Sequence, residues 1–118
     1  MSKDDYIKRE IKRLKKIFEN LTQDAAQVAE KLIENAAFMA VSLSDLQRII
    51  NEKGYTEEYQ NGENQFGTKK SSEVDIYNTM IKNFNTTMKQ LIDMLPDSPS
   101  GGNSRNAALD YINGRGAP

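Results

Sequence analysis

The chain contains no cysteine, no histidine and no tryptophan among its 118 residues. Without cysteine it has neither disulfides nor a thiolate, which is compatible with a reducing compartment. Without histidine it lacks the usual general base near neutral pH and the commonest metal ligand. No nucleophile–base pair or metal-binding constellation appears elsewhere in the sequence. We therefore predict that the protein is not an enzyme and holds no metal or cofactor.

Long apolar segments are missing too. No run approaches the ~20 residues that cross a bilayer, and no secretory segment is visible, so we expect a cytoplasmic protein that does not enter membranes. Hydrophobic residues make up 37% of the chain and charged residues 28%, with a formal net charge of −1. This balance is low in apolar residues for a compact globule and ordinary for long, exposed helices.

The sequence does contain a long helical pattern between Ala25 and Ile50. Apolar residues recur there in alternating steps of four and three, and neither glycine nor proline interrupts them. We predict one helix that runs to about Lys53 and ends at Gly54. At a rise of about 1.5 Å per residue, roughly 30 residues span about 45 Å, so we expect an elongated fold.

A second apolar seam extends from Val74 to Leu95 and stops before Pro96. Its outer positions are mostly asparagine and threonine, which are indifferent helix formers, so this helix depends on packing against a partner. We predict that it folds back, antiparallel, onto the first seam. Residues 22–96 would then form a long helical hairpin that serves as the oligomerisation domain.

The connection between the seams carries a strong β-hairpin signal. Asn61-Gly62 lies between two short polar runs, and both residues tolerate the positive φ of a tight turn. An isolated hairpin is only marginally stable. We therefore expect a short β-hairpin-like connection whose aromatic residues, Tyr55, Tyr59 and Phe66, lean on the helix ends.

The same connection comes close to a phosphate-binding loop. Gly62 and Gly67 have the required spacing, but Thr68 stands where that loop needs a lysine, and the run before it is polar rather than a buried strand. We interpret the segment as a hairpin followed by a helix cap, and not as a nucleotide site.

Positive charge is concentrated at the N-terminal end, where seven of the 16 basic residues precede residue 17. An apolar stripe from Ile7 to Leu21 predicts an amphipathic helix over residues 3–20, within a basic element at 1–21. Basic residues at helical spacing can contact successive phosphates of DNA. They are as often the solvated face of a helix, and the pattern leaves both open. Binding to a membrane surface is a weaker third option, because the apolar face lacks tryptophan and has little bulk. The predicted DNA-binding residues are Lys8, Arg9, Lys12, Arg13, Lys15 and Lys16.

From Asp97 onward the composition shifts to proline, serine, glycine and asparagine. Such a segment buries too little apolar surface to order itself. We predict that residues 97–118 are a flexible C-terminal tail in which 104–112 can form one or two helical turns.

The centre of the long helix has more apolar surface than one neighbour covers. Six apolar residues follow one another from Ala36 to Val41, so the helix is apolar on every side there. Either the first helix or another copy of the protein must cover Phe38 and Val41. We favour another copy and predict a homo-oligomer. The predicted interface residues are Leu32, Ala36, Phe38, Met39, Val41 and Leu43.

Residues 5–96 resemble the small terminase subunits of tailed phages, in the short-chain family found in phages and prophages of Gram-positive bacteria. The features that carry the resemblance are helix ends and turns rather than catalytic signatures. They are Asn51-Glu52-Lys53-Gly54, Asn61-Gly62, Lys69-Lys70-Ser71-Ser72-Glu73, Tyr77-Asn78 and the helix end at Leu91–Leu95.

The resemblance implies a non-enzymatic DNA-packaging protein. Small terminase subunits assemble into rings, bind double-stranded viral DNA and deliver it to the large terminase subunit, which carries the ATPase and nuclease. By that analogy the helical hairpin would build the ring, the first helix would contact DNA, and the tail would contact the large subunit in the host cytoplasm. The alternative is a helical protein–protein interaction module or coiled-coil regulator without affinity for DNA.

Overall fold

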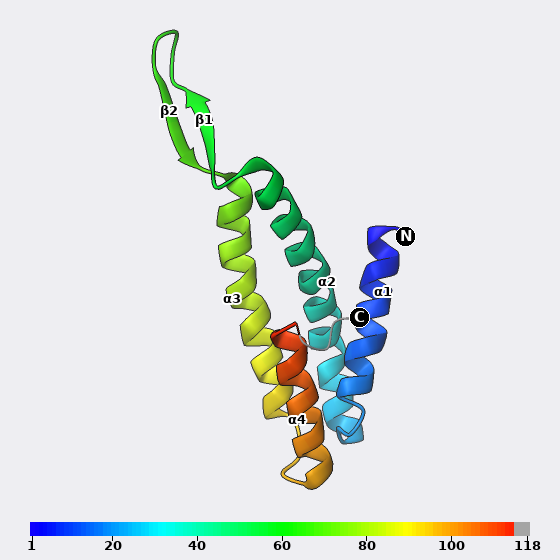
Figure 1. Ribbon diagram of the computed structural model, residues 1–118. Helices are drawn as coiled ribbons and strands as arrows, with labels where there is room; N and C mark the ends of the chain where they lie inside the picture. Colours follow the sequence, from blue (N-terminus) through cyan, green and yellow to red (C-terminus); the bar gives the residue numbers. More distant parts are fainter. Residues whose placement is uncertain (115–118) are drawn as a thin grey trace.

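A computed structural model describes residues 1–114 of the chain, with the side chain of residue 100 left out. Within this range the protein is mainly helical, with one two-stranded antiparallel sheet that joins two of the helices (Figure 1). The elements in chain order are α1 (Lys3–Ile17), α2 (Gln23–Lys53), β1 (Thr56–Gln60), β2 (Phe66–Lys70), α3 (Ser72–Asp93) and α4 (Pro99–Ile112).

Local capping explains where the helices begin. Each one follows a serine or threonine whose side-chain oxygen accepts a hydrogen bond from a backbone N–H of the first turn: Ser2, Thr22, Ser71 and Ser98. At Ser2 the bond is reciprocal, because its own N–H donates to the Asp5 carboxylate at 3.1 Å. The long helix α2 ends at Gly54, whose φ of 87° few other residues adopt.

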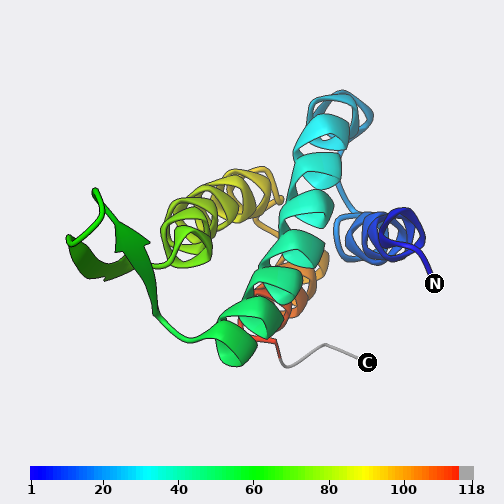
Figure 2. The same ribbon diagram turned by 90° about the horizontal axis from the view of Figure 1, so that it is seen from above.

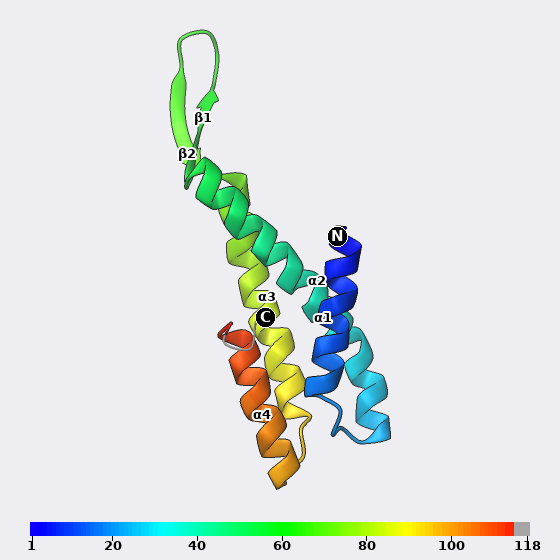
Figure 3. The same cartoon turned by 45° about the vertical axis from the view of Figure 1, so that its right-hand side comes forward.

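The helices alternate in direction and meet at one end of the molecule (Figures 1 and 3). Seen from above, α1 and α3 lie on opposite sides of α2 (Figure 2). Beyond this four-helix bundle, α2 and α3 continue as a pair that carries the hairpin at its tip. The radius of gyration is 18.0 Å and the longest dimension is 64 Å. Because a compact domain of this length has a radius of about 13–14 Å, the predicted elongated shape is confirmed.

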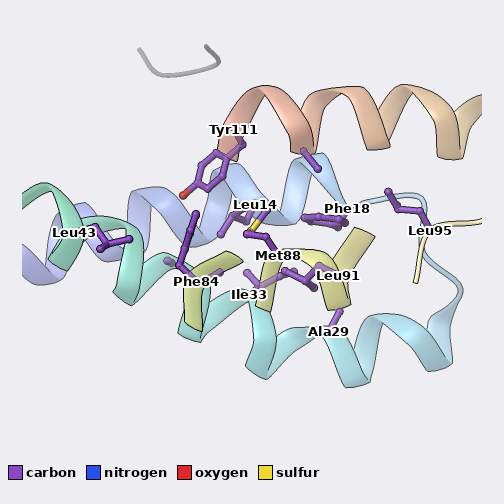
Figure 4. Close-up of a cluster of buried hydrophobic side chains, with 13 residues drawn as sticks. Leu14, Phe18, Ala29, Ile33, Leu43, Phe84, Met88, Leu91, Leu95 and Tyr111 are labelled. Carbon is purple, nitrogen blue, oxygen red and sulfur yellow. The ribbon is translucent and has the colours of Figure 1, made fainter. Parts of the chain in front are cut away.

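The hydrophobic core lies where all four helices meet (Figure 4). Leu14 of α1 and Met88 of α3 are fully buried there, and the rings of Phe84 and Tyr111 lie 6.3 Å apart. The predicted antiparallel packing of α2 against α3 is confirmed. Residues of α1 and α4 complete the core. The remaining buried apolar residues are Phe18, Ala29, Ile33, Ala36, Ala37, Leu43, Leu91, Leu95 and Ala108.

The prediction of a flexible tail over residues 97–118 is wrong for most of its length. Pro99–Ile112 form α4, and its residues Ala108 and Tyr111 are buried with side chains of the bundle. Proline at the first helical position is pre-organised for a helix. Burial of one face then stabilises a segment whose serine, glycine and asparagine content indicated disorder. Residues 115–118 of the predicted tail lie outside the described residues.

The hairpin forms where the sequence predicts it, but only one of its three aromatic residues lies against the helix ends. Tyr55 lines a groove with Ile50 of α2 and Tyr77 of α3, although its side chain is 72% exposed. Phe66 is 71% exposed, and for Phe66 and Tyr59 the expectation is wrong. Tyr59 instead lies over Gly67 across the sheet, where an added Cβ would come within 2.8 Å of its ring. The hairpin is held by its own ladder and by the two helix ends, and it projects into solvent.

Candidate nucleic-acid interface on the N-terminal helix

Helix α1 is fixed to the bundle by the apolar stripe that the sequence predicts. Leu14 and Phe18 are buried in the core, and Ile7 and Ile11 are partly buried against it. Because a helix that buries one stripe exposes the opposite side, this packing decides which basic side chains face water.

Five of the six predicted DNA-binding residues are exposed on α1: Lys8, Arg9, Lys12, Lys15 and Lys16. Lys8 pairs with Asp4 at 3.2 Å, but both side chains are more than two-thirds exposed, so the pair contributes little. The other four form no ion pair with any residue that the structure describes. Their charges are therefore available to a ligand.

Arg13, the sixth predicted residue, has a different environment. Its guanidinium lies 3.4 Å from the Glu10 carboxylate and 4.9 Å from the ring centroid of Tyr111 in α4. The Tyr111 hydroxyl donates to the same Glu10 oxygen at 3.0 Å. Arg13 thus belongs to the contact between α1 and α4. The sequence did not reveal this because the partner is 98 positions away in a segment that reads as a tail.

The electrostatics of this contact keep the charge of Glu10 away from the exposed side of α1. Burial raises the pKa of Tyr111, and the charge of Glu10 and the hydrogen bond to it raise that pKa further. The protonated hydroxyl then holds Glu10 at the bundle. The other two acids of α1, Asp4 and Asp5, lie in its first turn, where the helix dipole favours them.

The exposed cations cover a short length of helix. Lys8 and Lys16 are eight positions apart, which is about 12 Å along the axis at 1.5 Å per residue. Duplex DNA carries about one negative charge per 1.7 Å of its own axis. A helix laid on the backbone therefore brings these side chains to several phosphates at once.

Next to these cations, α1 and α4 form an open groove of about 550 Å³ that is lined by both polar and apolar surface. Arg13 and Lys16 line one side, Asn103 and Asp110 the other, and Asn20 donates to Ser104 across it at 3.2 Å. Mixed charge and exposure make it a poor site for a small molecule. Among the described residues no three acidic side chains gather to hold a metal ion, and no helix is long and apolar enough to cross a membrane.

The six predicted interface residues fall into three environments. Ala36 and Leu43 lie in the core of the chain itself and cannot meet a second copy in this fold. Leu32, Met39 and Val41 are partly buried. Phe38 is 48% exposed, with the Lys3 ammonium 5.0 Å above its ring.

The first helix covers part of the surplus apolar surface, which is one of the two outcomes that the sequence allowed. Val41 lines a groove between α1 and α2 together with Tyr6 and Arg9. Phe38 does not line this groove and stays half-exposed. The structure adds an apolar groove between α2 and α3, lined by Met39 and Met80, that the sequence did not predict. Ile76, 50% exposed, belongs to it and was missed because it lies off the heptad seam.

Comparison with known proteins assigns no family to this architecture. No family model matches the chain, and neither a curated protein nor a solved structure is significantly similar to it. The arrangement of exposed cations on a packed helix is therefore the strongest indication of what the molecule binds.

Proposed function

We propose that this protein is a non-enzymatic, DNA-binding subunit that helps to start viral genome packaging, as the small terminase subunits that it resembles do. The observation that carries the proposal is the exposed cluster on α1, in which Arg9, Lys12, Lys15 and Lys16 have no acidic partner among the described residues. Unpaired cations at helical spacing attract a polyanion and release its counterions on binding.

Assembly is the second part of the proposal. A cluster of a few cations gives weak, non-specific binding, and several copies in a ring would multiply it. Half-exposed Phe38 and the Met39–Ile76 groove supply apolar surface for contact between copies. Such a homo-oligomer would hold double-stranded viral DNA for the large terminase subunit in the host cytoplasm. The exposed side of α4 is the proposed contact for that subunit.

The experiment that tests DNA binding reverses two charges on α1. We expect Lys12→Glu with Lys16→Glu to lower the affinity for duplex DNA at least about tenfold, and to lower the salt dependence of binding by about one unit per lost phosphate contact. The measurement is fluorescence anisotropy with a labelled duplex at several salt concentrations.

The matched control is Lys82→Glu with Lys89→Glu, which makes the same charge change at two exposed positions of α3. It should keep most of the affinity. If both double variants bind alike, α1 is not the DNA surface. If the unmodified protein shows no salt-dependent affinity for DNA, the alternative function, a helical interaction module with a solvated basic face, is correct.

A further inference from the structure

The two strands of the hairpin carry opposite charge. Strand β1 contains Glu57 and Glu58 and no basic residue, whereas β2 contains Lys69 and Lys70 and no acidic residue. Within one chain the strands attract each other, as the 3.4 Å contact between Glu57 and Lys69 shows. Lys70 also pairs with Asp75 of α3 at 2.8 Å, but the side chains of Lys69 and Lys70 both stay more than half exposed. The β1 edge therefore remains acidic and the β2 edge basic toward a neighbouring molecule.

The register identifies which backbone groups point outward. Ser71 N–H donates to Tyr55 O at 2.9 Å and Asn61 N–H donates to Gln65 O at 2.7 Å, so these are hydrogen-bonded pairs. Such pairs alternate along an antiparallel ladder. The residues between them turn their N–H and C=O groups away from the partner strand. On β1 they are Thr56, Glu58 and Gln60, and on β2 they are Phe66, Thr68 and Lys70.

Both outer edges are unpaired in the described chain, since the sheet has only two strands. Neither strand contains proline, and the hairpin stands clear of the bundle (Figures 1 and 3). A two-stranded hairpin is marginally stable alone, and an open edge is a template for another strand. An added strand would supply the ladder that each edge lacks.

We infer that the hairpin pairs edge to edge with the hairpin of a second copy, with β2 of one copy against β1 of the next. Like edges cannot pair well, because two β1 strands bring glutamates together and two β2 strands bring lysines together, and like charges opposite each other are destabilising. Unlike edges set Lys69 of one copy beside Glu57 of the next, which repeats the ion pair inside each hairpin.

This pairing has a direction. When β2 meets the next β1 in the antiparallel sense, both hairpins point the same way and each copy keeps one acidic and one basic edge for its neighbours. The contact is head-to-tail, so it generates a closed ring or an open filament rather than a two-fold dimer. The inference rests on the self-assembly in the proposed function, but it does not depend on DNA binding.

Single cysteine substitutions test the proposed pairing of hairpins, because the natural chain contains no cysteine. Glu58→Cys and Thr68→Cys each place one cysteine at a residue whose backbone N–H and C=O point away from the partner strand, on β1 and on β2. Both variants keep the Glu57–Lys69 pair. Directly opposed residues in a ladder lie within disulfide distance. Mild oxidation of the two variants mixed together should give the mixed disulfide dimer, while each variant alone stays largely uncross-linked.

Homodimers of Glu58→Cys or of Thr68→Cys as the main product would overturn the head-to-tail pairing. Thr56→Cys and Gln60→Cys, mixed in turn with Thr68→Cys, cover a shifted register. If none of these mixtures cross-links, the hairpin is not a contact between copies. Asn85→Cys, exposed on α3, is the control and should not react with Thr68→Cys. If the mixtures do not cross-link but the protein binds DNA, only the pairing of hairpins is rejected. If they cross-link but the protein does not bind DNA, only the DNA-binding proposal is rejected.

Discussion

Tyr111 connects α4 to the first helix of the bundle. Its ring packs near Phe84 of α3, lies under the Arg13 guanidinium, and its hydroxyl donates to Glu10. A hydrogen bond to a charged group contributes more than a neutral one, and a buried acceptor that loses its donor is costly. One side chain thus connects α4 to both α1 and α3.

We expect Tyr111→Phe to lower the free energy of unfolding by about 1 kcal/mol at neutral pH, because the ring remains while Glu10 loses one of its two donors and keeps Arg13. Urea titration followed by circular dichroism measures this. Tyr6→Phe is the control, since the Tyr6 hydroxyl has no hydrogen-bond partner among the described residues. An equal loss in both variants would contradict the role of the hydrogen bond.

Because of the Tyr111 hydroxyl, we expect the free energy of unfolding to depend on pH. The pKa of Tyr111 is raised in the folded state, so the unfolded chain loses this proton first as the pH rises. The stability that comes from the protonated hydroxyl is complete below the unfolded value of about 10 and is lost above it. The difference in unfolding free energy between the natural protein and Tyr111→Phe should therefore narrow as the pH rises above about 10.

At the scale of elements, periodicity and capping predicted α1, α2, the hairpin and α3. Gly54 and Ser71 mark boundaries in the sequence that the structure keeps. Helix α4 could not be predicted in this way because its stabilisation is tertiary. Only Ala108 and Tyr111 of its apolar residues are buried, and two residues do not make a recognisable period. The exposed cations of α1 were predictable as a group. The contact of Arg13 with Tyr111 was not, because it depends on α4.

Two neighbouring glycines distinguish a packed α4 from a flexible tail. Gly102→Ala has no atom within 4 Å of the new Cβ, and it should raise the free energy of unfolding by about 0.5–1 kcal/mol because alanine is the better helix former. Gly101→Ala should lower it, because the new Cβ overlaps the Pro96 carbonyl oxygen. Thermal unfolding measures both. Equal midpoints for the two variants would mean that this segment does not pack as described.

At the scale of the whole molecule, the long pair of α2 and α3 leaves apolar surface that the bundle does not cover. Phe38 of α2 adds to it, since its ring is 48% exposed and carries the Lys3 ammonium of α1 5.0 Å above it. The sequence identified this residue from its place off the heptad seam. The seam also placed Ala36 and Leu43 against the second long helix, where the structure buries them, so their assignment to a contact between copies was wrong.

We expect Phe38→Glu to reduce self-association while the chain stays helical, because a carboxylate at a contact between copies must be desolvated. Light scattering over a range of concentrations gives the oligomeric state, and circular dichroism gives the helix content. Phe38→Leu, which keeps an apolar side chain, should associate like the natural protein. An intact oligomer in Phe38→Glu would place the contact between copies elsewhere.

The hydrogen bond from Tyr111 to Glu10 joins residues 101 positions apart, and this separation has a consequence for synthesis. The helical hairpin can form as soon as α3 has left the ribosome, yet the side of the bundle that α4 covers stays open until residue 111 emerges. Domains fold as units during translation, and exposed apolar surface on a nascent chain invites aggregation. Emergence of α4, rather than pairing of α2 with α3, is therefore the step that completes the core on this side.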